Sequence, residues 1–167
     1  MLSIVSYFKQ KVNVISLFIN YINMIMKYYI TGKRRGLGKA LSEIYDTVET
    51  MEECDVFINC KHDGFKQVEL LYQAAELNKK IINIGSNSPD ETKRVKHIYA
   101  VEKSALDKAN HQLFYQGINT TIVRFGYFDS PRVEHIDRKK MTIEYCMSVI
   151  DWIINQPHKV KEITVCP

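Results

Sequence analysis

Residues 27–45 read KYYITGKRRGLGKALSEIY, and this stretch decides the fold. A short apolar run at its start ends at Thr31 and Gly32, which is typical of a strand that enters a tight turn. From residue 37 to residue 45, apolar side chains recur at helical spacing. A strand, a glycine turn and a helix in immediate succession predict the first part of a β-α-β unit.

The same alternation of strands and helices continues to the C-terminus. The short, continuously apolar runs are typical of strands that are buried on both faces of a parallel sheet. Strands separated by helices predict a Rossmann-like α/β fold, a three-layer sandwich with a reduced, mostly parallel sheet. Right-handed crossovers would bring the carboxyl ends of the strands, where ligands bind, to one edge. The expected strands are 27–30, 47–48, 55–60, 80–85, 120–125 and 162–165, and the expected helices are 37–45, 65–78, 97–116 and 142–155.

Composition and charge narrow the function. The chain has 167 residues, of which 46% are hydrophobic and 25% charged, and this fits one globular domain. The net charge of +4 suits a phosphate-bearing ligand but is too weak to indicate nucleic acid. The cysteines form no CxxC motif and the histidines form no HExxH motif, so we expect no metal site. Free thiols indicate a reducing, cytoplasmic location.

Residues 1–26 differ from the rest, and we exclude them from the fold prediction. The run 12–26 is apolar, but it carries three asparagines and is shorter than the about 20 residues that a membrane span needs. Three interpretations remain: an extra amphipathic helix on the domain, a membrane-surface helix, or translated sequence upstream of the true start. Methionines directly before the first strand favour the last, so we expect a domain at 27–167 and no membrane association.

The segment between the first strand and the first helix has the composition of a phosphate-binding loop. Glycine lets the backbone turn tightly and approach a phosphate, and the start of the helix offers free N–H groups. The basic side chains in the loop either pair with the extra phosphate of NADP or form a solvated turn. The candidate nucleotide-binding residues are Thr31, Gly32, Lys33, Arg34, Arg35, Gly36, Leu37 and Gly38.

A second group of candidates is catalytic. Tyr99 and Lys103 are four positions apart and so share one helix face, and Ser86 ends the strand that leads to this helix. A phenol with a pKa of ~10 is a poor base at neutral pH, but a neighbouring ammonium lowers that pKa. Tyr99 could then donate a proton to a carbonyl oxygen or take one from an alcohol, while Ser86 holds the substrate oxygen. Ser88 is the alternative serine.

Together these motifs resemble the short-chain dehydrogenase/reductase family. The similarity covers almost all of residues 27–167, and the joint match is more specific than any single motif. The family's TGxxxGxG loop matches residues 31–38, its DVLVNNAG-like strand is similar to residues 55–62, its Ser and Tyr-x-x-x-Lys match Ser86, Tyr99 and Lys103, and its PGxxxT pattern aligns with residues 125–130.

The resemblance implies a nicotinamide cofactor and carbonyl–alcohol redox chemistry on a small molecule. Arg35 directly precedes the second glycine of the loop, and in this family a basic residue there often accompanies NADP, with NAD as the alternative. Lys103 would also hold the nicotinamide ribose. Asn59 and Gly126 would contact the cofactor, and Ser130 would lie near its carboxamide. A homodimer or homotetramer, paired through the tyrosine-bearing helix, is also common in the family.

The chain departs from the family pattern in its first half. The segment between Thr31 and Asn59 is too short for the usual connection, so one strand and at least one helix that shape the adenine pocket are missing. Lys61 and His62 replace a small Ala-Gly pair, and the helix at 65–78 has no Asn where the family places its fourth catalytic residue. Three hypotheses follow: an active NADP-dependent reductase, a catalytically impaired nucleotide-binding or interaction module with the same fold, or a purely structural or membrane-associated protein, which only the N-terminal segment supports.

Overall fold

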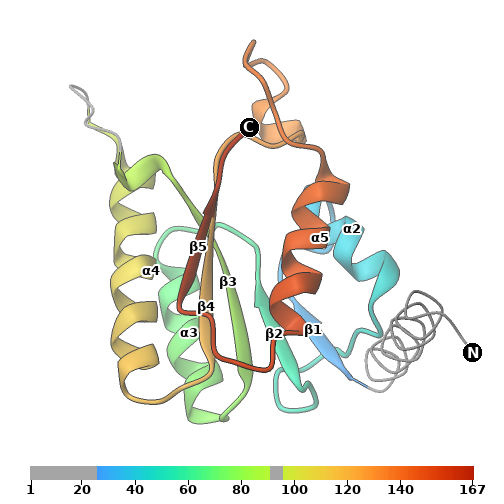
Figure 1. Ribbon diagram of the computed structural model, residues 1–167, viewed down its shortest axis with the longest axis vertical. Helices are drawn as coiled ribbons and strands as arrows, with labels where there is room; N and C mark the ends of the chain where they lie inside the picture. The colour runs from blue at the N-terminus through green and yellow to red at the C-terminus, as the bar shows by residue number, and fades with distance from the viewer. Residues whose placement is uncertain (1–25, 91–95) are drawn as a thin grey trace, which may run out of the picture.

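The computed structural model describes residues 26–90 and 96–167, and its centre is a five-stranded sheet (Figure 1). All neighbouring strands are parallel, and their spatial order follows the chain, β1-β2-β3-β4-β5. Helices lie on both faces, so the predicted Rossmann-like three-layer fold is confirmed, with a fully parallel sheet. The strands are β1 (Tyr28–Ile30), β2 (Val56–Asn59), β3 (Lys80–Ser86), β4 (Thr120–Phe125) and β5 (Glu162–Val165).

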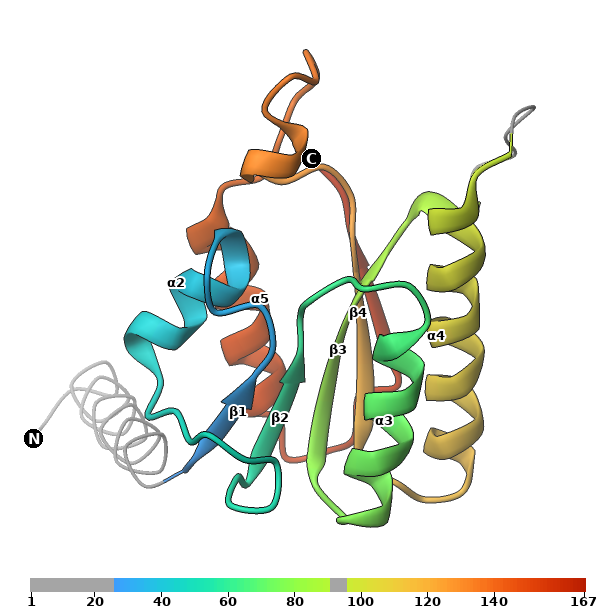
Figure 2. The same cartoon turned by 180° about the vertical axis from the view of Figure 1, so that it is seen from behind.

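One face of the sheet is covered by α2 (Gly36–Ile44) and α5 (Ile143–Ile154), which pack against each other (Figures 1 and 2). Both helices bury apolar side chains at helical spacing, as in the run Cys146, Ile150 and Ile153 of α5. Thr142 caps α5, because its hydroxyl accepts a hydrogen bond from the backbone N–H of Tyr145. This face holds the larger of the two apolar cores.

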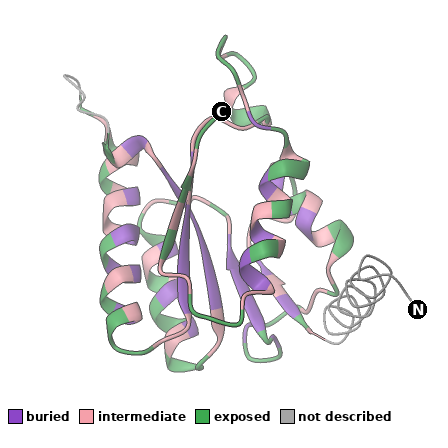
Figure 3. Cartoon of the chain, viewed as in Figure 1, coloured by how far each residue is buried: buried purple, intermediate pink, exposed green. Residues whose placement is uncertain are grey.

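The opposite face is covered by α3 (Lys66–Glu76) and α4 (Ile98–Tyr115), which also contact each other. Leu71 and Ala74 of α3 and Leu106 of α4 are buried there. Figure 3 shows the central strands buried along their length, while the helices expose their outer faces. Continuous apolar runs in β2, β3 and β4 are therefore explained by cover on both sides.

The connection from β1 to β2 passes round the free edge of the sheet. After α2 on one face, Thr47 forms a parallel bridge with Tyr28, and Val48 N donates a hydrogen bond to the Tyr28 carbonyl. Met51 and Cys54 then enter the core on the other face. The predicted brief strand at 47–48 is thus a single bridge, and β1 pairs directly with β2, as expected if a strand is missing.

The helix positions show that the crossovers do not all share one hand. The steps from β2 to β3 and from β3 to β4 run in one direction with α3 and α4 on the same face. The step from β4 to β5 continues in that direction, but α5 lies on the opposite face. This crossover therefore has the opposite hand, and the prediction of uniformly right-handed crossovers is wrong. The carboxyl ends of the strands meet at one edge because all strands are parallel, whatever the handedness of the crossovers.

Two short 3-10 helices, η1 (Ser88–Asp90) and η2 (Pro131–Val133), were not expected from the sequence. They follow β3 and β4 and so lie at the carboxyl edge of the sheet. The hypotheses on residues 1–26 fall outside the described residues, apart from Met26, which packs on the core. No helix in the described ranges is long and apolar enough to cross a membrane.

Candidate functional site

The carboxyl ends of all five strands meet at one edge of the sheet, because every strand points the same way. Figure 1 shows the C-terminus, which follows β5 directly, at this edge. In doubly wound α/β proteins, ligands bind where the strands end. The candidate site is therefore built from the segments after β1, β2, β3 and β4, together with the helices that they lead into.

Thr31 and two glycines shape the loop between β1 and α2. The Thr31 hydroxyl accepts hydrogen bonds from the backbone N–H groups of Cys60 and Lys61, at 2.8 and 2.9 Å. The loop is thereby tied to the end of β2. Gly32 and Gly36 have φ angles of +84° and +58°, in the left-handed region that favours glycine. The turn predicted from the glycines is present, with both glycines where the backbone requires them.

Gly38 lets the first turn of α2 pack directly on this loop. A Cβ at Gly38 would lie 2.5 Å from the Gly32 carbonyl oxygen, which is too close for any side chain. Arg35 precedes the helix without a side-chain cap hydrogen bond, and the first turn contains no acidic residue. The Cys60 thiol lies against the Gly38 N–H, but no acidic side chain of this turn meets the N–H groups at the start of α2. This end of the helix therefore suits a phosphate.

The basic residues of the loop point in different directions. The Lys33 ammonium donates to the Val48 carbonyl at 3.3 Å and lies 3.4 Å from the Glu49 carboxylate. Lys33 therefore supports the connection that wraps round β1. Arg34 and Arg35 are exposed instead. The two guanidinium groups are the members of the basic turn that remain open to a ligand from solution.

Ser86, Tyr99 and Lys103 come together as the sequence spacing predicts. Ser86 is the last residue of β3, and it lies close enough to Tyr99, in the first turn of α4, for its hydroxyl to lower the pKa of the phenol. The Lys103 Nζ lies 5.7 Å from the centre of the Tyr99 ring. Ser88 belongs to η1, and its hydroxyl is turned toward His97, at 3.5 Å from Nδ1. Ser86 rather than Ser88 is therefore the serine beside the phenol.

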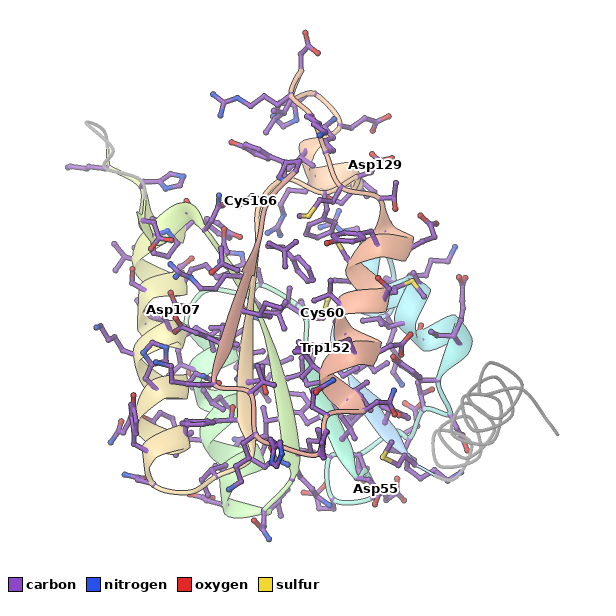
Figure 4. The ribbon with its side chains drawn as sticks, in the orientation of Figure 1. Asp55, Cys60, Asp107, Asp129, Trp152 and Cys166 are labelled. Carbon is purple, nitrogen blue, oxygen red and sulfur yellow. The ribbon has the colours of Figure 1, made fainter. Side chains whose placement is uncertain are left out.

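Burial sets the ionisation of these groups. The pKa of Tyr99 is raised by burial, and Ser86 and the Arg132 charge only partly oppose this rise. The expected lowering of this pKa by a neighbouring ammonium is therefore wrong, because burial has the larger effect. Lys103 is 3% exposed, and burial lowers its pKa to about 8. The pKa of the Cys60 thiol rises to about 11 because of its burial. Cys60 lies in the loop after β2 (Figure 4) and is therefore no nucleophile at neutral pH.

Gln67 was not identified from the sequence, and it holds Lys103. The Lys103 ammonium donates 2.7 Å hydrogen bonds to the Gln67 side-chain carbonyl and to the Ile84 backbone carbonyl. The Gln67 amide donates to the Asn59 carbonyl at 2.8 Å, so its orientation is fixed. Nothing in the sequence distinguishes this buried glutamine from the exposed Gln73 on the same helix. It lies at the start of α3, where no asparagine was found.

The Asn59 side chain lies inside the protein, whereas the family resemblance implies a cofactor contact for this residue. Its side chain is fully buried and donates to the Gln67 backbone carbonyl and to the Asn83 side chain, at 2.8 and 3.0 Å. Asn83 in turn bonds to Asn110 and Thr120. Asn59 therefore belongs to a buried amide network beneath the site. It fixes Gln67, and through Gln67 it fixes Lys103.

The loop after β4 lies over the glycine loop, but its two candidate residues differ. A Cβ at Gly36 would lie 3.8 Å from the Ser130 Cβ, so Ser130 is next to the start of α2. Gly126 packs on the C-terminal strand instead: its N–H donates to the Val165 carbonyl, and an added Cβ would meet Pro167 at 3.1 Å. Ser130 is thus well placed for a ligand on the loop, and Gly126 is not.

Arg132, in η2, is a further residue that the sequence did not identify. Its positive charge opposes protonation of both Tyr99 and Lys103 and so lowers the pKa of each, although burial has the larger effect. Arg132 is exposed and follows Ser130 and Pro131 along the loop. The segment after β4 therefore brings a cation near the catalytic candidates, and no motif spacing in the sequence predicts this.

Lys61 and His62, the large residues in place of Ala-Gly, lie on either side of the site. A Cβ at Gly32 would meet the Lys61 Cβ at 3.3 Å, so Lys61 covers the beginning of the glycine loop. His62 turns the other way and makes an edge contact with Tyr99, with 4.8 Å between ring centres. Its Nε2 lies 2.7 Å from a Glu102 carboxylate oxygen. His62 therefore contacts the catalytic candidates directly.

These residues fit one half of a dinucleotide better than the other. The glycine loop and the bare start of α2 suit a pyrophosphate, and Tyr99, Lys103 and Ser130 lie on the side where a nicotinamide would extend. On the side where the adenosine would lie, β1 is bordered only by the Thr47 bridge. The strand that the family resemblance implies at this edge is missing. A metal fits less well, since the described residues contain no group of three or more metal-binding side chains.

Comparison with known proteins gives a likeness in structure but none in sequence. No family model and no curated protein matches this sequence. Many solved structures have a similar fold. The likeness extends over most of both chains, although the sequences have little in common.

Three of these structures are dehydrogenases. A short-chain dehydrogenase from Burkholderia cenocepacia in complex with NADP is 14% identical, with 83% of this chain and 87% of that chain covered and a TM-score of 0.62. An alcohol dehydrogenase from the archaeon Thermococcus sibiricus, complexed with 5-hydroxy-NADP, is 12% identical, with coverages of 84% and 95% and a TM-score of 0.63. A 4-hydroxyisoleucine dehydrogenase complexed with NADH is 13% identical, with coverages of 84% and 96% and a TM-score of 0.61. The chain therefore has the fold of the short-chain dehydrogenases.

Proposed function

We propose that this chain is an NAD(P)-dependent oxidoreductase that interconverts a carbonyl group and an alcohol on a small molecule. The observation that carries the proposal is the convergence of Ser86, Tyr99 and Lys103, with the Lys103 Nζ 5.7 Å from the centre of the Tyr99 ring and Ser86 close enough to act on the phenol. These groups share one edge of the sheet with the glycine loop. The dehydrogenases of similar fold were solved with NADH or NADP bound, which supports a nicotinamide cofactor here.

The bound cofactor would supply the hydride, and the side chains of this chain would handle the proton and the substrate oxygen. Ser86 would donate a hydrogen bond to that oxygen and hold it beside the Tyr99 hydroxyl. Tyr99 would give its proton to the oxygen during reduction and take one back during oxidation. Lys103 uses two donors within the protein and keeps a third N–H for a ribose hydroxyl.

The exposed guanidinium groups favour NADP over NAD. Arg34 and Arg35 stand at the side of the glycine loop, in the basic turn. Guanidinium binds phosphate with two parallel hydrogen bonds, and the extra phosphate of NADP would be the group that they recognise. We therefore expect the affinity for NADPH to exceed that for NADH, and to fall at high salt.

A second candidate is a nucleotide-binding or interaction module without turnover. Two observations favour it: Lys61 covers the start of the glycine loop, and the strand that would border the adenosine side is reduced to the bridge at Thr47. Both features would lower the affinity for the cofactor and leave the position of Tyr99 unchanged. The two candidates therefore differ in cofactor affinity and in turnover, and one set of measurements separates them.

The test is calorimetric titration of the full chain with NADPH and NADH, followed by NADPH oxidation with a panel of aldehydes and ketones. Turnover that is abolished by Tyr99→Phe, with NADPH affinity retained, supports the oxidoreductase. Tyr115→Phe is the matched control, since Tyr115 lies on the same helix and is 76% exposed. Binding without turnover supports the second candidate. No binding of either nucleotide at millimolar concentration rejects both.

A further inference from the structure

His62 and Glu102 form a pair that the proposed reaction does not yet use. His62 lies in the loop after β2, and Glu102 lies on α4, one turn after Tyr99. The His62 Nε2 is 2.7 Å from the Glu102 carboxylate, and the two side chains are 21% and 12% exposed. Gly64 closes the same loop with a φ angle of +55°, and a Cβ there would lie 3.6 Å from the other Glu102 oxygen. Two residues of this loop, His62 and Gly64, therefore lie next to the Glu102 carboxylate.

The pair fixes which imidazole nitrogen is free. Nε2 faces the carboxylate and so carries the proton that is donated to Glu102. Nδ1 is then the nitrogen that can gain or lose a proton. The imidazole ring contacts the edge of Tyr99, with 4.8 Å between ring centres and 69° between ring planes. The imidazole ring thus contacts the Tyr99 ring and is 21% exposed, and the Glu102 carboxylate fixes its orientation.

The other neighbours of Tyr99 are less suited to exchange its proton with water. Lys103 is 3% exposed, and both of its short hydrogen bonds go to neutral acceptors inside the protein. Ser86 is 7% exposed and does not titrate. His97 is the rival, but its ring centre is 6.0 Å from that of Tyr99, and no carboxylate is paired with it among the described residues.

We propose that His62, oriented by Glu102, returns the proton that Tyr99 gives to the substrate. This inference rests on the proposed carbonyl reduction. In each cycle, the Tyr99 O–H bond breaks and its proton passes to the carbonyl oxygen, which leaves a phenolate. The Nδ1–H bond of the His62 imidazolium then breaks, its proton goes to the phenolate, and a proton from water restores the imidazolium. Oxidation of an alcohol runs the same transfers in reverse.

The energetics favour this direction of transfer. Imidazolium is a stronger acid than phenol, so an imidazolium N–H gives its proton readily to a phenolate. Burial raises the pKa of Tyr99 and widens this gap, against the smaller opposing effects of Ser86 and Arg132. Lys61-His62 would otherwise be an obstacle in place of two small residues. In this proposal, His62 takes part in proton transfer instead of obstructing the site.

The test uses the full chain with NADPH and phenanthrenequinone as the carbonyl probe. His62→Ala should lower kcat by about 10²-fold with KM little changed, and Glu102→Gln should lower it by about tenfold. Added imidazole should raise the kcat of His62→Ala at least about tenfold, because it can occupy the vacated space and carry the proton. This rescue should saturate as the imidazole concentration rises. His111→Ala is the matched control, since His111 pairs with Glu162 on the same helix but away from Tyr99.

Each outcome decides the inference. Unaltered kcat in His62→Ala, or a loss that imidazole does not restore, would overturn it while leaving the proposed function intact. A larger loss with imidazole rescue in His97→Ala would assign the exchange to His97 and overturn it too. If His62→Ala does not fold by circular dichroism, Glu102→Gln decides, and full kcat in that variant rejects the pair. Absence of NADPH oxidation by the unaltered chain rejects the proposed function and this inference together.

Discussion

The Lys103 ammonium donates a 2.7 Å hydrogen bond to the side-chain carbonyl of Gln67, and this contact joins α4 to the start of α3. Gln67 cannot turn away, because its amide is held by the Asn59 carbonyl. The second short hydrogen bond of Lys103 also ends on a neutral acceptor, the Ile84 carbonyl. The ammonium is therefore buried without a direct carboxylate partner, which is why burial dominates and lowers its pKa to about 8.

This pKa predicts the alkaline limit of the reaction. Lys103 carries its charge below pH 8 and loses it above. In the proposed reaction the charged form is the one that keeps an N–H for the ribose hydroxyl of the cofactor. We expect kcat/KM for carbonyl reduction to fall about tenfold per pH unit above the pKa of Lys103. The profile is measured with NADPH at saturating concentration. A profile that stays flat up to the ordinary lysine pKa of ~10.4 would contradict the assignment.

Substitution of Gln67 should shift the alkaline limit of kcat/KM, and the charge of the new side chain should determine the direction of the shift. Gln67→Glu places a carboxylate beside the ammonium and should raise the pKa of Lys103 by about 1 to 3 units. Gln67→Met removes an acceptor without changing the size of the side chain much, and should lower this pKa further. Gln73→Glu serves as the control, because Gln73 is exposed on the same helix. Identical alkaline limits in all four proteins would exclude any effect of Gln67 on Lys103.

The features that could be predicted from the sequence depend on local rules. The turn at Gly32 and Gly36 needs positive φ angles, and glycine is the residue that adopts them readily, so sequence and backbone agree there. Tyr99 and Lys103 share a face because of helix geometry alone. The buried strands were predicted from continuous apolar runs, for which cover on both faces is the physical reason. In each case, a few neighbouring residues contain all the necessary information.

The features that could not be predicted depend on contacts across the chain. His62 and Glu102 are 40 positions apart, and only the fold brings them together. Asn59 was assigned to a ligand because it ends a strand, but it serves the buried amide network instead. The side chain of a polar residue at a strand end can point toward the site or into the core. The alternation of side chains along a strand does not determine the direction of its last residue.

Removal of the close contact at Gly38 should test the phosphate-binding loop. Gly38→Ala would place a Cβ 2.5 Å from the Gly32 oxygen and 2.8 Å from its carbonyl carbon, both backbone atoms. The loop must then shift, and we expect nucleotide affinity to fall at least about tenfold, with a loss of stability of about 1 to 3 kcal/mol. Lys39→Ala, at the exposed next position, is the control. Calorimetric affinity for NADPH equal to that of the unaltered chain would show that the loop does not bind the nucleotide.

Asp107 should make the stability of the chain depend on pH. It projects from α4 (Figure 4), lies 3.4 Å from the Arg124 guanidinium, and its Oδ1 has no hydrogen-bond partner among the described residues. Burial raises its pKa to about 6, against the opposing attraction of Arg124. Because this pKa lies above its ordinary value of 3.8, the folded state holds the proton more tightly than the unfolded state does. The contribution of Asp107 to stability is therefore full below pH 3.8 and is lost as the pH rises through 6.

Asp107→Asn removes this titration, because a carboxamide resembles the protonated acid. Relative to the unaltered chain, the variant should gain about 2 kcal/mol in free energy of unfolding between pH 4 and pH 7. Urea unfolding followed by the fluorescence of Trp152, the single tryptophan, measures it. Asp137→Asn, at an exposed position, should show no such gain. Equal pH dependence in the unaltered chain and Asp107→Asn would mean that Asp107 is ionised in the folded state throughout, with Arg124 offsetting the full effect of burial.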